Sequence, residues 1–175
     1  MPRARPALNG FTAAEVITVS GLSRAMIEYL NRHGYLRPAY APKDNPRGRV
    51  RYYSYRDLVV ARLIQLLREG GIQLTRVRAA AQQLSEDDFW SGSEEPPRGR
   101  EWLVSDGRVV ELRDGRTILE RLRRGRPASF AFVVHLGQLR NEVRARVPAE
   151  KRSRFSMAVD ALIFTDTRVE AHAYG

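Results

Sequence analysis

The chain contains no cysteine, which excludes disulfide bonds, thiol nucleophiles and metal sites built on thiolates. It has three histidines, and their spacing matches no metal site. No segment approaches the roughly 18 consecutive apolar residues of a membrane span, and residues 1–10 lack the apolar run of a signal peptide. No glycine loop carries the lysine and strand-to-helix context of a phosphate-binding motif. We expect a cytoplasmic protein that is not an enzyme and uses no cofactor and no metal.

Positive charge is concentrated in one half of the chain. Residues 1–84 carry 14 Lys/Arg and five Asp/Glu, a net charge of +9, whereas residues 85–175 carry 16 and 15, a net of +1. This distribution predicts a polyanionic partner for the N-terminal half, with nucleic acid ahead of a membrane surface. The alternative is a basic, solvated surface without a partner. The 43% hydrophobic content is enough to bury a core in one domain or in two small ones.

Two short helices are predicted at the start of this half. Thr12 and Glu15 form a capping box for a helix from residue 13, and Ser23 caps a second helix over residues 24–33, which Gly34 ends. Helical spacing turns Met26, Ile27 and Leu30 inward. The open face then holds Arg24, Ala25, Glu28, Tyr29 and Arg32. A short helix presented by a tight turn is typical of a helix-turn-helix that places side chains in a DNA groove.

Residues 39–53 combine turn-forming residues with β-prone ends, which predicts a hairpin, or wing. Its basic residues are Lys43, Arg47, Arg49 and Arg51. Tyr52 and Tyr53 follow them, and tyrosine hydroxyls can donate to phosphate. We expect this hairpin to contact the DNA backbone.

Two more helices are predicted to complete the core. Ser54 and Asp57 form a second capping box, and apolar residues recur at helical spacing up to Gly70 and Gly71. Thr75 is the expected cap of a fourth helix, which would run to residue 84. Residues 1–10 are expected to be a disordered arm.

Residues 85–100 are polar and acidic with adjacent prolines, which indicates a linker. Its Phe89 and Trp90 are expected to dock on a neighbouring domain rather than to stack on a base. Its carboxylates are expected to be solvated rather than to bind an ion. Residues 101–175 differ in character and are expected to form a small α+β module.

In this C-terminal module, residues 102–104 and 109–112 flank Asp106-Gly107 in a hairpin pattern, residues 129–135 are strand-like, and residues 136–147 have helical spacing up to Pro148. Residues 117–124 are either a helical turn or a third strand. The apolar run at residues 157–164 is expected to pair with this module or with a second copy of it. The basic cluster at residues 121–126 is interpreted as a surface turn beside acidic residues, with a second nucleic-acid contact as the alternative.

Four ordered motifs carry a resemblance to a known family: FTAAEV, GLSRAMIEYLNRHGYLRP, RYYSYRDL and LIQLLREGGIQLTRVR. Over residues 12–84, about 40% of the chain, the sequence resembles the DNA-binding domain of MerR-family transcriptional regulators, which are winged helix-turn-helix proteins. The resemblance implies that Ser23, Arg24 and Tyr29 belong to the recognition helix. It also implies that Arg51, Tyr52 and Tyr53 lie on the return strand of the wing, where family members contact phosphate and sugar.

The sequence departs from this family in two places. Glu28 stands where family members commonly have arginine, and Leu30 where tyrosine is frequent. Glu28 either accepts from a cytosine amino group, pairs with Arg24 or Arg32, or faces away, and we favour the internal pair. Residues 85–100 replace the long antiparallel dimerisation helix of the family, so the C-terminal module is expected to supply the dimer contact.

The sequence therefore predicts a mainly α fold with small β elements. Residues 11–84 would form a winged helix-turn-helix domain, and residues 101–175 the small α+β dimerisation or partner-binding module. The predicted function is sequence-specific double-stranded DNA binding by a homodimeric, nucleoid-associated transcriptional regulator, a repressor or autoregulator. The alternatives are an excisionase-like DNA-bending protein, or an antitoxin or adaptor that binds a small protein partner. The predicted DNA-binding residues are Ser23, Arg24, Tyr29, Arg32, Arg47, Arg49, Arg51, Tyr52 and Tyr53.

Overall fold

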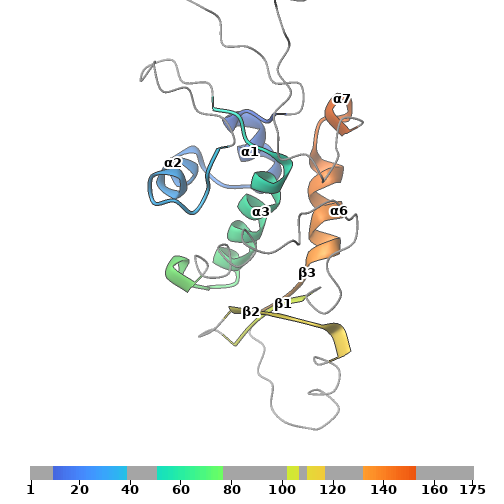
Figure 1. Cartoon of the computed structure of the whole chain (residues 1–175). Coiled ribbons are helices and arrows are strands. Elements are labelled where there is room, and N and C mark those ends of the chain that lie inside the picture. Colours follow the sequence, from blue (N-terminus) through green and yellow to red (C-terminus); the bar gives the residue numbers. More distant parts are fainter. Residues whose placement is uncertain (1–9, 39–50, 77–101, 107–109, 117–131, 153–175) are drawn as a thin grey trace, which may run out of the picture.

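A computed structural model of the chain describes residues 10–38, 51–76, 102–106, 110–116 and 132–152 (Figure 1). Helices predominate in these ranges, and they are accompanied by one small antiparallel sheet. The helices and strands are α1 (Ala13–Ser20), α2 (Arg24–Arg32), α3 (Tyr55–Glu69), β1 (Trp102–Ser105), β2 (Val110–Arg113), β3 (Phe132–His135), α6 (Leu136–Arg146) and α7 (Ala149–Arg152). The predicted class, mainly α with small β elements, is confirmed.

The α1–turn–α2 unit forms where its caps predicted. Glu15 Oε2 accepts from the Thr12 backbone at 2.8 Å, and Thr12 Oγ1 accepts from the Glu15 backbone at 3.3 Å, which completes the capping box of α1. Gly21 ends α1 in the left-handed conformation, with φ of 80°, which glycine adopts without steric cost. Ser23 then caps α2 by accepting from the backbone of Met26 at 3.2 Å. Both predicted caps are confirmed.

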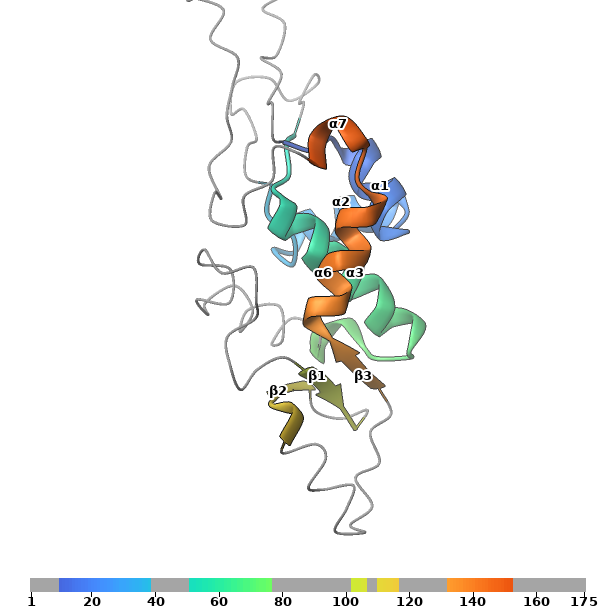
Figure 2. The ribbon, with the colours of Figure 1, turned by 90° about the vertical axis from the view of Figure 1, so that its right-hand side faces the viewer.

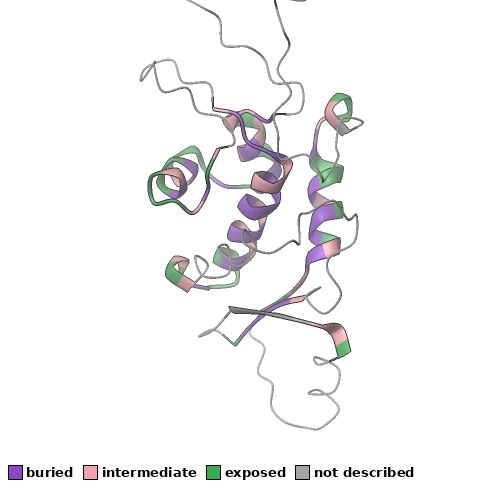
Figure 3. Cartoon of the chain, viewed as in Figure 1, coloured by how far each residue is buried: buried purple, intermediate pink, exposed green. Residues whose placement is uncertain are grey.

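The amphipathic pattern of α2 explains how it is fixed to the core. Ile27 and Leu30 are buried and Met26 is half-buried, as the spacing predicted. The helix ends one residue earlier than expected, with His33 as its C-cap and Gly34 following at φ of 74°. The opposite side of α2 stays exposed, as Figure 3 shows in green.

The central helix is α3, which starts at the predicted capping box of Ser54 and Asp57 and ends at Glu69, with Gly70 as its C-cap. Just before it, the backbones of Tyr53 and Phe11 exchange hydrogen bonds of 2.8 and 2.9 Å and so join the entry of α3 to the entry of α1. The prediction for Thr75 is wrong. Helical structure begins at Leu74, because the Gln73 carbonyl already accepts from the Arg76 backbone, and Thr75 lies inside that turn.

The sheet has the strand order β2-β1-β3 with both pairings antiparallel. Trp102 is opposite Arg113 on one side and His135 on the other. The predicted hairpin of β1 and β2, the strand β3 and the helix α6 are confirmed, and α6 ends before Pro148 as expected.

Helix α6 lies alongside α3, and its apolar side joins the same core as α1 and α3 (Figure 2). Leu139 and Val143 are buried in this shared core, and each such side chain contributes about 1.5–3 kcal/mol by leaving water. In Figure 1, α2 and α6 lie on opposite sides of α3, and in Figure 2 α6 lies in front of α3. Helix α6 therefore packs behind the helix-turn-helix and does not cover the outer face of α2.

Several predictions concern residues outside the described ranges. They are the arm before Gly10, the wing at residues 39–50 with Lys43, Arg47 and Arg49, the fourth helix over residues 77–84, the linker at residues 85–100 with Phe89 and Trp90, and the segments 117–124, 121–126 and 157–164.

Candidate nucleic-acid interface

The exposed face of α2 carries the polar side chains expected of a recognition helix. Arg24 begins the helix, Tyr29 follows in its middle with 39% of its surface exposed, and Arg32 is in the last turn; both arginines are exposed. Ser23 is exposed as well, but its hydroxyl already accepts from the Met26 backbone. Because Ile27 and Leu30 hold the other side in the core, Arg24, Tyr29 and Arg32 project together from one face.

Tyr29 is also part of a small aromatic group at the end of α2. Its ring centroid lies 4.3 Å from that of His33 and 6.4 Å from that of Tyr35, with the Tyr35 ring nearly parallel. These contacts orient the Tyr29 ring, part of which stays exposed to solvent. Neither His33 nor Tyr35 was predicted as a site residue, although the four-residue spacing of Tyr29 and His33 is the signal that places them on one face.

The return from the predicted wing holds Arg51, Tyr52 and Tyr53 in three different settings. Arg51 is half-buried, Tyr52 is 7% exposed, and Tyr53 is completely buried. The Tyr53 hydroxyl accepts a hydrogen bond of 2.7 Å from Asn31 Nδ2 in α2. In this structure Tyr53 therefore joins α2 to the entry of α3, and Arg51 is the most open of the three side chains.

Glu28 lies on the exposed face of α2 between the two arginines. Within the described part of the chain its carboxylate forms no ion pair and no hydrogen bond with another side chain. The favoured internal pair with Arg24 or Arg32 is therefore wrong. An exposed ion pair at this spacing stabilises a helix by only about 0.3–0.5 kcal/mol, and its formation must order two long side chains. The net attraction is therefore too small to keep Glu28 paired.

A comparison with family models matches residues 11–84 to the MerR HTH family regulatory proteins. Residues 11–84 are a MerR-family helix-turn-helix domain. Such a domain implies DNA-binding transcriptional regulation, and regulators of this kind are non-enzymatic DNA-binding proteins. Among curated proteins, none is significantly similar to the chain. The resemblance that the four motifs predicted is thus confirmed for this domain.

The MerR-family domain packs against α6, which follows it in the sequence. Tyr55, in the first turn of α3, donates from its hydroxyl to the Arg140 carbonyl of α6 at 2.7 Å. Burial raises the pKa of the Tyr55 phenol, against the opposing effect of the positive charges of Arg140 and Arg144. No local pattern indicates this contact, because the two residues are 85 positions apart.

In the described ranges, no group of three or more histidine, aspartate or glutamate side chains is placed to hold a metal ion. None of the helices described has the length and apolar character that a bilayer crossing requires. The exposed arginines and tyrosine of α2 form the candidate nucleic-acid interface.

Proposed function

We propose that the protein is a sequence-specific double-stranded DNA-binding regulator that acts as a homodimeric repressor or autoregulator. The observation that carries this proposal is the two-sided character of α2. Its apolar side is fixed in the core, while Arg24, Tyr29 and Arg32 share the open side. Arginine and tyrosine in this arrangement suit base edges and phosphates in a major groove.

We propose that α2 enters the major groove and that the predicted wing contacts the flanking backbone through Arg47, Arg49 and Arg51. The net charge of +9 in residues 1–84 supports this orientation, because it supplies a favourable field for a polyanion. Tyr52 and Tyr53 belong to the same return strand. The burial of Tyr53 favours a role in orienting α2 over a direct phosphate contact.

We further propose how the protein forms its dimer and how it regulates transcription. Residues 85–100 are rich in acidic residues, glycine and proline, which is unsuited to the long dimerisation helix of the family. We therefore assign the dimer contact to residues 101–175, with residues 1–10 as an arm and 85–100 as a linker. Repression by occupancy of a cytoplasmic, nucleoid-bound operator is favoured because no effector pocket is predicted by the sequence.

Selection of bound fragments from random and genomic DNA by the full chain tests this proposal. The mass of the complex on the selected sequence should then be measured. An inverted repeat bound by two subunits is the expected result, because a two-fold dimer imposes its symmetry on its site. Salt-sensitive binding without a motif would contradict it and favour an architectural, DNA-bending role. No DNA binding, together with co-purification of a small protein, would favour an adaptor or antitoxin.

A further inference from the structure

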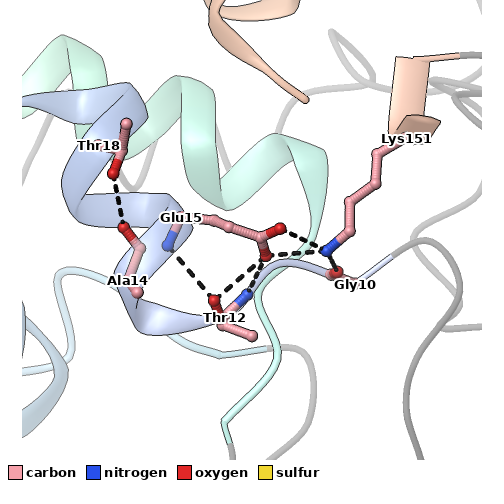
Figure 4. Close-up of polar contacts among 6 residues, drawn as sticks. All are labelled: Gly10, Thr12, Ala14, Glu15, Thr18 and Lys151. Carbon is pink, nitrogen blue, oxygen red and sulfur yellow. Dashed lines mark hydrogen bonds and ion pairs between the residues drawn. The ribbon is translucent and has the colours of Figure 1, made fainter. Parts of the chain in front are cut away.

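The C-terminal segment, residues 136–152 with α6 and α7, contacts the N-terminal end of α1. Lys151 Nζ, in α7, lies 2.7 and 2.8 Å from the two carboxylate oxygens of Glu15 and donates to the Gly10 carbonyl at 3.0 Å (Figure 4). The ammonium also lies 5.2 Å from the ring centroid of Phe11. Glu15 is the capping-box carboxylate of α1, so Lys151 fixes the group that starts the helix.

The same segment holds the other end of α1. Arg146 Nη1 donates to the Val19 carbonyl at 3.3 Å, and Arg62 Nη1, from α3, donates to the next carbonyl, that of Ser20, at 3.2 Å. The last carbonyls of a helix lack partners within the helix, and positive charge there is favourable for the helix dipole. Two guanidinium groups thus satisfy consecutive carbonyls at the entry of the turn before α2.

One carboxylate joins the two guanidinium groups. Glu142 Oε1 lies 2.8 Å from Arg146 Nη2 and 3.0 Å from Arg62 Nη2, and it also accepts from Arg62 Nε at 3.2 Å. The Arg62 side chain is only 12% exposed, so its position depends on this partner rather than on solvent. Glu142 therefore sets both arginines against the end of α1.

These contacts lie directly before the turn between α1 and α2. Gly21 and Leu22 follow Ser20 directly, and their amides donate to the Ile17 carbonyl at 2.9 Å and to the Ser20 hydroxyl at 3.1 Å. An eight-residue helix is only about 12 Å long. Because the turn follows the last residue of α1 directly, a small tilt of α1 would also move the turn and α2.

We propose that Arg146 and Lys151 are positioning residues for the recognition helix. Together they fix both ends of α1 and thereby the orientation in which α2 meets DNA. This inference rests on the proposed function for its effect on DNA binding. It extends that function beyond residues 11–84, since both residues lie in the C-terminal segment.

The test compares Arg146→Met and Lys151→Met with Arg144→Met in the full chain. Arg144 is exposed on α6, and Arg144→Met removes the same charge. This variant therefore controls for the loss of electrostatic attraction alone. We expect each of the first two variants to lose about tenfold in affinity for the selected DNA site, as for one lost base contact. Affinity for unrelated DNA should fall no further than in Arg144→Met. Lys151→Arg keeps the charge and should restore site affinity.

Equal losses on selected and unrelated DNA would overturn the proposal, because they would indicate a phosphate contact. Should Arg146→Met prevent folding, Glu142→Gln is the milder variant and should lower the ratio of selected to unrelated binding in the same direction; an unchanged ratio would contradict the proposal.

Hydrogen exchange tests the positioning role without DNA. The amides of Gly21 and Leu22 should exchange faster in Arg146→Met than in Arg144→Met. Unchanged exchange at both amides would overturn the inference. If the unaltered protein selected no DNA sequence, the proposed function would fail, yet this measurement would still decide whether Arg146 positions the turn.

Discussion

Asn31 Nδ2 donates a hydrogen bond of 2.7 Å to the hydroxyl of Tyr53, which joins the last turn of α2 to the residues just before α3. The Tyr53 backbone is paired with Phe11 at the same point, and its ring is completely buried. Tyr53 thus connects three segments of the MerR-family domain.

Tyr53→Phe should lower the free energy of unfolding by about 1 kcal/mol, since it removes one hydrogen bond and leaves the Asn31 amide without this acceptor. Chemical denaturation measures the change. Tyr29→Phe is the control. Because the Tyr29 side chain is exposed, the free energy of unfolding of this variant should equal that of the unaltered protein. A Tyr53→Phe variant with full stability but weaker DNA binding would show instead that this hydroxyl contacts phosphate.

The predicted wing should contribute to the salt dependence of DNA binding. If Arg49 and Arg51 each contact phosphate, replacing both with alanine should weaken binding to all sequences and flatten the logarithmic salt dependence by about two units of slope. Arg68→Ala combined with Arg116→Ala removes the same charge from exposed positions elsewhere and should leave the slope nearly unchanged. An unchanged slope in the Arg49 and Arg51 variant would remove the wing from the interface.

Glu28 is expected to take part in base selection, because it is exposed on α2 and forms no ion pair in the described part of the chain. A carboxylate there can accept from a cytosine amino group, so Glu28→Gln should change the preferred motif at one position and reduce affinity for the original site about tenfold. Repeating the fragment selection with the variant measures this, with Glu69→Gln on α3 as the charge-matched control. An identical motif would mean that Glu28 faces away from the bases.

The stability of the protein should depend on Tyr55 at alkaline pH. Its pKa is raised in the folded state above the ordinary value of 10.0, so the folded state binds this proton more tightly than the unfolded state. The resulting stabilisation is complete below pH 10.0 and is lost as pH rises through the folded pKa. Urea denaturation of the protein and of Tyr55→Phe at about pH 8 and about pH 11 checks the effect. The variant should lose less stability over this range, and a parallel loss would contradict the assignment.

Local signals predicted most of the helix-turn-helix. Capping boxes such as Thr12 with Glu15 act within a single turn, so their residues can be recognised by spacing alone. The inward positions of Ile27 and Leu30 follow from helical periodicity, and the β1–β2 hairpin from a turn between two apolar runs.

The remaining features depend on contacts between distant residues. Lys151 and Glu15 are 136 positions apart, and nothing in the spacing of either residue indicates that they meet. The burial of Tyr53 depends on its pairing with Phe11, which a hairpin pattern in residues 39–53 does not specify. The pairing of Glu28 failed because exposed i,i+4 charges have too small a net attraction for spacing to decide whether they meet.

The most direct test of the central claim is the effect of Arg24→Ala on binding to the selected DNA site. Arg68→Ala, an exposed arginine on α3, is the matched control. If α2 is the recognition helix, Arg24→Ala should weaken binding to the selected site by about 10- to 100-fold and to a scrambled site far less, while Arg68→Ala affects both sites slightly and equally. Equal effects of the two variants on both DNA sequences would contradict the account, because α2 would then contribute charge but no base recognition.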